Sequence, residues 1–301
     1  MFTKGEFVMN KLQIRNSLLL FLAAVIWGCA FAAQSAGLEY IGPFTFTTLR
    51  SLIGSFVLLP CIWFFGRQKK AAADKPAEDK KILLKSGLIC GLIIFTAVNL
   101  QQFALLYTSV GKSGFLTALY IVIVPLIGIF IGKRPGKKLC IAVLCAVIGM
   151  YLLCMKAGSL KLEFADILLL LCAVVFAFHI MVVDHYSQQV DGVKLSCIQF
   201  FICGTLSAVL MLCFETPSFS AICMAWAPVL YTGVLSTGVA YTLQIVGQKG
   251  LNPVLASLLM SLESVVSALA GWLILGQVLS GRELLGCAVM FVAIILAQLP
   301  E

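Results

Sequence analysis

The chain has 301 residues, of which 61% are hydrophobic and 11% are charged, and its formal net charge is +8. Ordinary soluble domains carry about 25% charged residues, so this composition lacks the polar side chains that cover a soluble core. It excludes a soluble globular protein and predicts an all-α membrane protein with several spans.

Ten apolar runs are each long enough to cross a hydrocarbon layer about 30 Å thick. We expect transmembrane helices at Ser17–Ser35, Phe44–Gly66, Leu83–Leu106, Gly114–Gly132, Leu139–Met155, Phe164–Val183, Leu195–Phe214, Trp226–Gly247, Pro253–Gly276 and Leu284–Leu299. The first run follows Lys4, Lys11 and Arg15, as the apolar part of a signal peptide does. Because it is long enough to span and no secreted soluble domain follows it, we expect it to remain as a helix.

The positions of Lys and Arg predict the orientation, because these residues are retained on the cytoplasmic side of short loops. With both termini in the cytoplasm, the inner segments hold 16 of the 21 Lys and Arg residues. We therefore expect a multi-pass protein of the plasma (inner) membrane of a bacterium, with both termini cytoplasmic. This topology accounts for the net charge, so we expect no nucleic-acid partner.

The second half of the chain repeats the pattern of the first. Thr117–Arg134 aligns without gaps on Ser261–Val278, and an upstream register carries Arg50 onto Gln199. Each half holds five spans, an odd number, so the second half enters the membrane in the opposite sense. We predict two inverted repeats, residues 1–156 and 157–301, around a central cavity. Such halves can open a shared site to each side of the membrane in turn.

Glu263 is the main candidate for a functional residue, because carboxylates deep in a membrane are costly and usually face a bundle interior or water. It lies eleven residues into its span, about 16 Å deep, near the middle of the hydrocarbon core. It shares a helix face with Met260 and Ser267, whereas Leu255, Leu258, Leu262, Leu269 and Leu273 form a stripe that we expect to face lipid. Its role is either to bind a cationic group or a proton, or to pack against neighbouring helices.

Other polar or aromatic residues occur at compatible depths. We expect the substrate-binding residues to be Glu263, Trp27, Asn99, Tyr120, Thr237, Tyr241, Ser267 and His179, with Gln34, Thr117 and Ser236 at similar levels. His179 has two interpretations, a structural histidine or a proton carrier. Arg50 lies near the outer end of its span, where it can reach the surface, and it is also a candidate counter-ion for Glu263.

Small residues and one proline indicate how the helices pack. Gly87 and Gly91, like Gly128 and Gly132, are spaced to allow close helix approach. Pro125 frees a backbone carbonyl and permits bending. We assign Arg50, Pro125, Gly128 and Gly132 structural or gating roles.

The sequence contains no pattern typical of a metal, cofactor or catalytic site. Its twelve cysteines include no Cys-x-x-Cys pair, and His, Cys and Asp do not cluster. The segment from Gly111 to Gly114 resembles the motif of an intramembrane serine protease. However, His179 lies about 24 Å below Ser113, too far for a nucleophile and its base. We expect no metal, no cofactor and no enzymatic activity.

The order of these features resembles the drug/metabolite transporter superfamily, and within it the EamA-like branch. The residues that carry the resemblance are Trp27-Gly28, Arg50, Ala104-Leu105, Thr108-Ser109, Ser261-Leu262-Glu263, Gly271-Trp272 and Leu275-Gly276. Ser264 stands where the family often has proline, so we expect no proline kink beside Glu263, and Gln277 replaces a frequent glutamate. The resemblance implies a fold of ten helices in which the first, third, fourth, sixth, eighth and ninth surround a cavity for small organic solutes.

These observations together predict a secondary active transporter that works by alternating access and exports amino acids or related zwitterions. The expected partners are a small-molecule substrate and the lipid bilayer, with protons as the simplest coupling ion; the oligomeric state is left open. Two alternatives remain. One is an uncoupled facilitator or pore for small solutes or nucleobases, and the other is a membrane sensor that does not transport.

Overall fold

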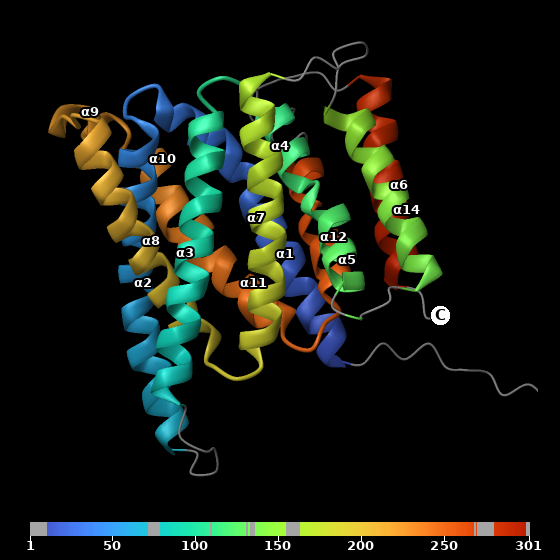
Figure 1. Cartoon of the computed structure of the whole chain (residues 1–301), viewed down its shortest axis with the longest axis horizontal. Coiled ribbons are helices and arrows are strands. Elements are labelled where there is room, and N and C mark those ends of the chain that lie inside the picture. Colours follow the sequence, from blue (N-terminus) through green and yellow to red (C-terminus); the bar gives the residue numbers. More distant parts are fainter. Residues whose placement is uncertain are drawn as a thin grey trace, which may run out of the picture.

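The structure is a computed structural model that describes residues 11–71, 79–108, 110–130, 132, 136–154, 163–267, 269 and 280–298. All regular secondary structure in these ranges is helical, and the helices run side by side in one bundle (Figure 1). The expected all-helical membrane protein is confirmed for the described residues.

Fourteen helical elements have defined bounds. They are α1 (Lys11–Leu38), α2 (Pro43–Ala71), α3 (Lys80–Ala104), α4 (Val110–Ala118), α5 (Tyr120–Phe130), α6 (Lys137–Cys154), α7 (Phe164–Ser187), α8 (Gly192–Phe214), α9 (Phe219–Met224), α10 (Trp226–Tyr231), the π-helix η1 (Thr232–Ala240), α11 (Tyr241–Gln248), α12 (Pro253–Met260) and α14 (Gly281–Gln298).

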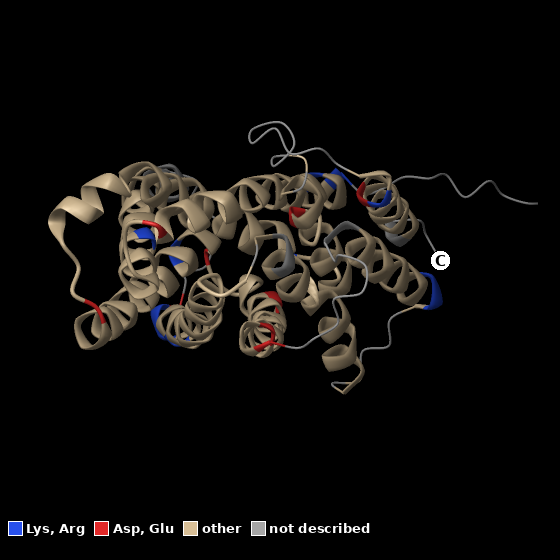
Figure 2. Cartoon of the chain, turned by 90° about the horizontal axis from the view of Figure 1, so that it is seen from above, with Lys and Arg blue, Asp and Glu red and all other residues tan. Residues whose placement is uncertain are grey.

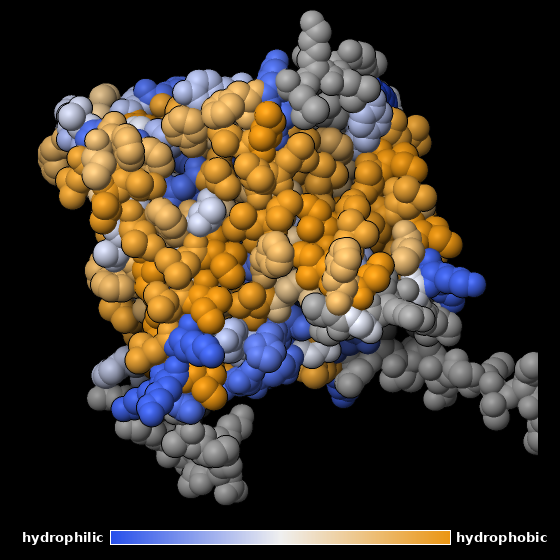
Figure 3. Space-filling model, in the orientation of Figure 1, coloured by the Kyte–Doolittle hydropathy of each residue, from blue (hydrophilic) through white to orange (hydrophobic). Residues whose placement is uncertain are grey.

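Seven helical segments among the described residues are long and apolar enough to cross a membrane. Large hydrophobic side chains such as Leu18, Leu84 and Leu212 are exposed on their outer faces. The space-filling view shows a broad hydrophobic belt with hydrophilic residues gathered towards the two ends of the helices (Figure 3). Exposing this apolar surface to water would cost free energy, whereas in a bilayer it matches the hydrocarbon layer.

Glycine permits the closest helix contacts. A Cβ atom on Gly87 or Gly91 would lie within 3 Å of Ile198 or Ile202 of α8, respectively. The close approach that the sequence predicts for these two glycines is therefore confirmed. Gly149 of α6 likewise lies against the carbonyl of Gly286 in α14, so these two helices form a closely packed pair.

Two of the expected spans are interrupted near their middles. The fourth expected span is divided into α4 and α5 at Leu119, and α12 ends at Met260 before a turn at Ser261 and Leu262. At both junctions a backbone N–H donates to the carbonyl three residues earlier, as in a 3₁₀ turn. These bonds are Leu119 N to Leu116 O and Leu262 N to Leu259 O, each at 3.3 Å. Tyr120 and Glu263 directly follow these junctions.

Two expectations about packing are wrong. The leucine stripe of the ninth expected span does not face lipid: Leu255, Leu258 and Leu262 are at most 6% exposed. The reason is that α12 contacts α1, α5, α6, α7, α11 and α14 and is enclosed by protein. Gly132 does not belong to a helix face either, because α5 ends at Phe130 and Gly132 has a φ angle of +82° in the following turn.

Candidate functional site

A cavity lies at the centre of the bundle, with lining side chains from seven of the expected spans. It contains about 480 Å³ of space free of atoms, part of which is open to solvent, so its occupant is limited to a small molecule. Its lining is Trp27, Phe31, Gln34, Arg50, Gln101, Thr117, Tyr120, Phe176, Ile180, Ser236, Tyr241, Gln244, Met260 and Glu263. These residues come from the first, third, fourth, sixth, eighth and ninth spans, as the family resemblance implies, and Arg50 adds the second.

Glu263 contributes the acidic group of the cavity. It is 6% exposed, and the hydroxyl of Tyr120 donates a hydrogen bond to its Oε1 at 3.3 Å. The hydroxyl of Ser261 donates to the carbonyl of Leu258, a local bond that competes with the regular helix pattern. Although Ser264 replaces the family's proline, α12 ends at Met260 and a turn at Ser261 and Leu262 directly precedes Glu263.

Arg50 contributes the basic group. It is 4% exposed, and its Nη1 donates to Oε1 of Gln34 at 2.8 Å. Gln34 in turn donates to the carbonyl of Ala30, which fixes the orientation of its amide. The Nη2 atom of Arg50 has no hydrogen-bond partner among the described residues. The sequence placed Arg50 near enough to the surface to reach it, whereas the structure turns it inwards to the cavity.

Trp27 and Tyr241 form an aromatic wall of the cavity. Their rings lie 4.7 Å apart at an interplanar angle of 62°, and the Trp27 indole donates to the carbonyl of Ser236 at 3.3 Å. Tyr241 lies within electrostatic range of both Arg50 and Glu263. The described lining thus combines an acidic and a basic side chain with apolar and aromatic surface.

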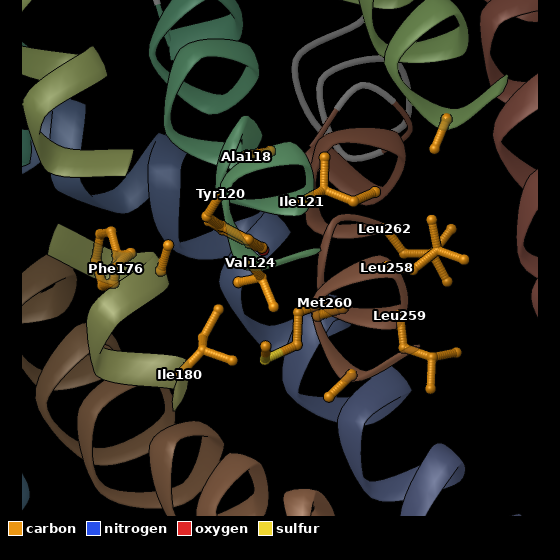
Figure 4. Close-up of a cluster of buried hydrophobic side chains, with 14 of the residues drawn as sticks. Ala118, Tyr120, Ile121, Val124, Phe176, Ile180, Leu258, Leu259, Met260 and Leu262 are labelled. Carbon is orange, nitrogen blue, oxygen red and sulfur yellow. The ribbon is translucent and has the colours of Figure 1, made fainter. Parts of the chain in front are cut away.

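The apolar part of the lining comes from both halves of the chain. In the close-up, Phe176, Ile180, Tyr120 and Met260 border a common space, whereas Leu262 extends from the opposite side of its helix (Figure 4). Tyr120 and Met260 are at most 4% exposed, so they are held by dense packing.

Four of the eight predicted binding residues line the cavity: Trp27, Tyr120, Tyr241 and Glu263. The other four, which are Asn99, Thr237, Ser267 and His179, do not belong to its described lining, because their helices turn them elsewhere. Asn99 donates to the hydroxyl of Ser207 in α8 at 2.9 Å, and Thr237 packs against Gly54 in α2. Ser267 is half-buried one turn beyond Glu263.

His179 lies directly behind the aromatic wall. Its Nε2 pairs with Oε1 of Gln199 at 3.0 Å, and its ring meets that of Tyr241 edge to face at 6.4 Å. The side chain is fully buried. This geometry supports the structural interpretation of His179.

Sequence reasoning did not identify two amides of the lining, Gln101 and Gln244. Gln101 donates to the hydroxyl of Thr117 at 3.2 Å, and Oε1 of Gln244 has no partner among the described residues. The repeat alignment contained a further signal. A shift of 149 residues carries Trp27 onto Phe176 and Phe31 onto Ile180, and these four residues all line the cavity.

Several other predicted features lie away from the cavity or outside the described residues. Pro125 and Gly128 are buried within α5, five and eight residues after Tyr120. The motif residues Ser109, Gly271, Trp272, Leu275, Gly276 and Gln277, together with Leu273 of the predicted stripe, lie outside the described residues. Within the described part of the chain, no group of three or more His, Cys, Asp or Glu residues is arranged to hold a metal ion.

Charged residues are few in the bundle as a whole. Viewed along the helices, Lys, Arg, Asp and Glu are scattered among a large majority of uncharged residues (Figure 2). Arg50 and Glu263 are the charged residues of the cavity lining. Neither of them forms an ion pair with another residue that the structure describes.

Comparison with known proteins gives one family. The model of the EamA-like transporter family matches residues 15–155 and again residues 163–299. The protein named "Uncharacterized transporter" from Archaeoglobus fulgidus is 29% identical over 283 residues, covering 93% of this chain and 84% of that protein. The "Uncharacterized transporter YwfM" from Bacillus subtilis is 25% identical over 296 residues, covering 93% and 92%. A solved crystal structure with 19% identity superposes with a TM-score of 0.77 over 94% of this chain and 98% of that chain, which shows a shared fold.

Proposed function

Because the chain belongs to the EamA-like transporter family, we propose that it is a secondary active transporter that exports amino acids or related zwitterions by alternating access. The observation that carries this function is the central cavity, which is lined from both halves of the chain and holds one acidic and one basic side chain. A solute with both charges complements such a lining.

The architecture supports movement as well as binding. The family model matches the chain twice in succession, consistent with repeats at 1–156 and 157–301. We propose that these repeats form ten spans of opposite insertion, with both termini in the cytoplasm of a bacterial cell. Discontinuous helices at the repeat interface are typical of transporters of this kind, and the junctions at Leu119 and Ser261 supply two of them.

We propose distinct roles for the lining residues. Glu263 binds the cationic end of the substrate or carries the coupling proton, and Tyr120 orients it through its hydrogen bond. Trp27 and Tyr241 contact the apolar part of the substrate. Pro125 and Gly128 let α5 adjust as the cavity changes its opening.

Counterflow in liposomes tests this function. Purified protein is reconstituted, the vesicles are loaded with one unlabelled member of an amino-acid and nucleobase panel, and entry of the labelled compound is measured. A carrier that alternates between two openings accelerates entry when the same compound is inside. Equal entry into loaded and empty vesicles would indicate a pore, and no entry of any panel member would favour a sensor.

A further inference from the structure

We propose, on the basis of the transport function above, that Arg50 is the specificity-determining residue that binds the carboxylate of the substrate, with Gln34 as its positioning residue. The occupant is then a molecule with a carboxylate at Arg50 and a protonated amine towards Glu263 and Gln244. Neutral solutes such as nucleobases, and amines without a carboxylate, are poor substrates.

The hydrogen bonding of the buried Arg50 guanidinium is incomplete. Gln34 accepts from Nη1 at 2.8 Å, while the buried Nη2 has no partner among the described residues. A guanidinium presents parallel N–H groups that match the two oxygens of a carboxylate. Arg50 belongs to the cavity lining, and in the proposed complex its unpaired Nη2 is the donor that meets the carboxylate.

Charge balance points in the same direction. A buried charge without a partner is costly, and the only acidic residue of the described lining, Glu263, forms no ion pair with Arg50. A zwitterion offers a partner to each of these two side chains. Gln244 adds an unpaired Oε1, an acceptor for the N–H groups of an ammonium.

The opposite repeat shows that the fold itself does not need this charge. The repeat alignment carries Arg50 onto Gln199, a neutral amide. Gln199 is fully buried, pairs with His179 and does not belong to the cavity lining. The aligned position in the other repeat, which lies outside the lining, thus carries no cation, whereas the position in the lining carries one.

A carboxylate fits better than a phosphate. Both anions suit the arginine fork, but the described lining contains a single basic residue together with the carboxylate of Glu263. A dianionic phosphate group would leave excess negative charge beside Glu263. A monoanion with an attached amine leaves the site neutral.

The test compares acids with their matched analogues in the counterflow assay. Each of the common L-amino acids is offered beside its C-terminal amide, the amine that lacks the carboxyl group, and a phosphate monoester of the same size. Wild-type protein is expected to move at least one acid about tenfold or more faster than its amide, the scale of losing a charge-assisted hydrogen bond. In Arg50→Gln this acid-to-amide ratio falls towards one, and Arg50→Lys keeps part of it.

Two further variants separate recognition from folding. Gln34→Glu keeps the arginine but places a carboxylate beside its Nη1, so acid transport falls while the protein remains folded. Arg15→Gln removes an exposed guanidinium at the end of α1, outside the cavity, and leaves the ratio unchanged. The melting temperature of every variant is recorded, and the ratio is read from variants that stay folded, including Arg50→Lys and Gln34→Glu.

The outcomes distinguish this assignment from the transport function itself. If wild-type protein moves amides, amines or phosphate esters as fast as acids, or if Arg50→Gln slows all compounds equally, the carboxylate assignment is wrong although the protein is a carrier. If wild-type protein shows no counterflow of any panel member, the proposed transport function and the assignment fail together.

Discussion

Gly28 of α1 packs directly against the helical segment that carries Glu263, and replacing it with alanine should loosen that contact. A Cβ atom at Gly28 would lie 2.6 Å from Cβ of Val266 and 2.8 Å from the carbonyl oxygen of Glu263. Ordinary contacts are 3.4–4 Å, so the two helices must separate by most of an ångström. The obstacle includes backbone, which cannot rotate away as a flexible side chain can.

The size of the effect follows from overpacking. Extra atoms forced into a close-packed interior cost about 1–3 kcal/mol of unfolding free energy. Gly114 supplies a matched control, because no described atom lies within 4 Å of a Cβ atom at that position in α4. There the same substitution favours the helix, so Gly114→Ala should be neutral or stabilising by up to about 1 kcal/mol.

Unfolding of both variants by titration with SDS in mixed micelles measures the difference, and counterflow measures its effect on transport. Gly28→Ala should unfold at a lower SDS concentration than wild type. It should also transport more slowly, because the new methyl group displaces the backbone carbonyl of Glu263 and, with it, the side chain of Glu263. If Gly28→Ala and Gly114→Ala were equally stable and equally active, α1 would not pack on Glu263 as described.

Two further substitutions test a contact at the start of α2 and a contact inside the cavity. Glu215 accepts hydrogen bonds from the backbone N–H groups of Phe44 and Thr45 at 2.8 and 2.7 Å, so Glu215→Gln leaves one donor poorly paired at the start of α2. SDS titration should show a loss of about 1–3 kcal/mol, and an unchanged curve would contradict this helix cap. Tyr120→Phe removes the hydroxyl that donates to Glu263 but keeps the ring, so stability should fall by about 1–3 kcal/mol while the transport rate falls several-fold. Equal rates for Tyr120→Phe and wild type would show that this hydrogen bond does not serve transport.

The sequence was sufficient to find the depth of the site but not the rotation of every helix around it. Trp27, Tyr120, Tyr241 and Glu263 are aromatic or acidic residues near the middle of their spans, and the cavity collects all four. Depth follows from counting residues along a helix, because the rise per residue is constant. Asn99 lies at a similar depth but faces α8, since its rotation depends on which neighbours its helix packs against.

The misplaced leucine stripe has the same origin. An apolar face on a transmembrane helix suits lipid and protein interior equally well, because both are apolar. Leu258 and Leu262 are buried because several helices, α1 and α5 foremost, enclose this part of the chain. Hydropathy along one helix does not contain this information, which arises only when distant parts of the chain come together.

The inward turn of Arg50 was also beyond the reach of residue counting. Seven residues from the start of α2 place it about 10 Å from the helix end, a distance that a long side chain spans to reach water. Its direction depends on Gln34 in α1, sixteen residues earlier. A contact between neighbouring helices therefore decides its environment.

The most direct test of the central claim is transport driven by a pH gradient in liposomes, with wild type beside Glu263→Gln. Glu283→Gln is the control, because it neutralises a carboxylate in the first turn of α14, outside the cavity. We expect a pH gradient to drive accumulation of an amino acid by wild type and by Glu283→Gln but not by Glu263→Gln. If Glu263→Gln transports with the rate and pH dependence of wild type, Glu263 is a buried structural carboxylate and the cavity does not work as proposed.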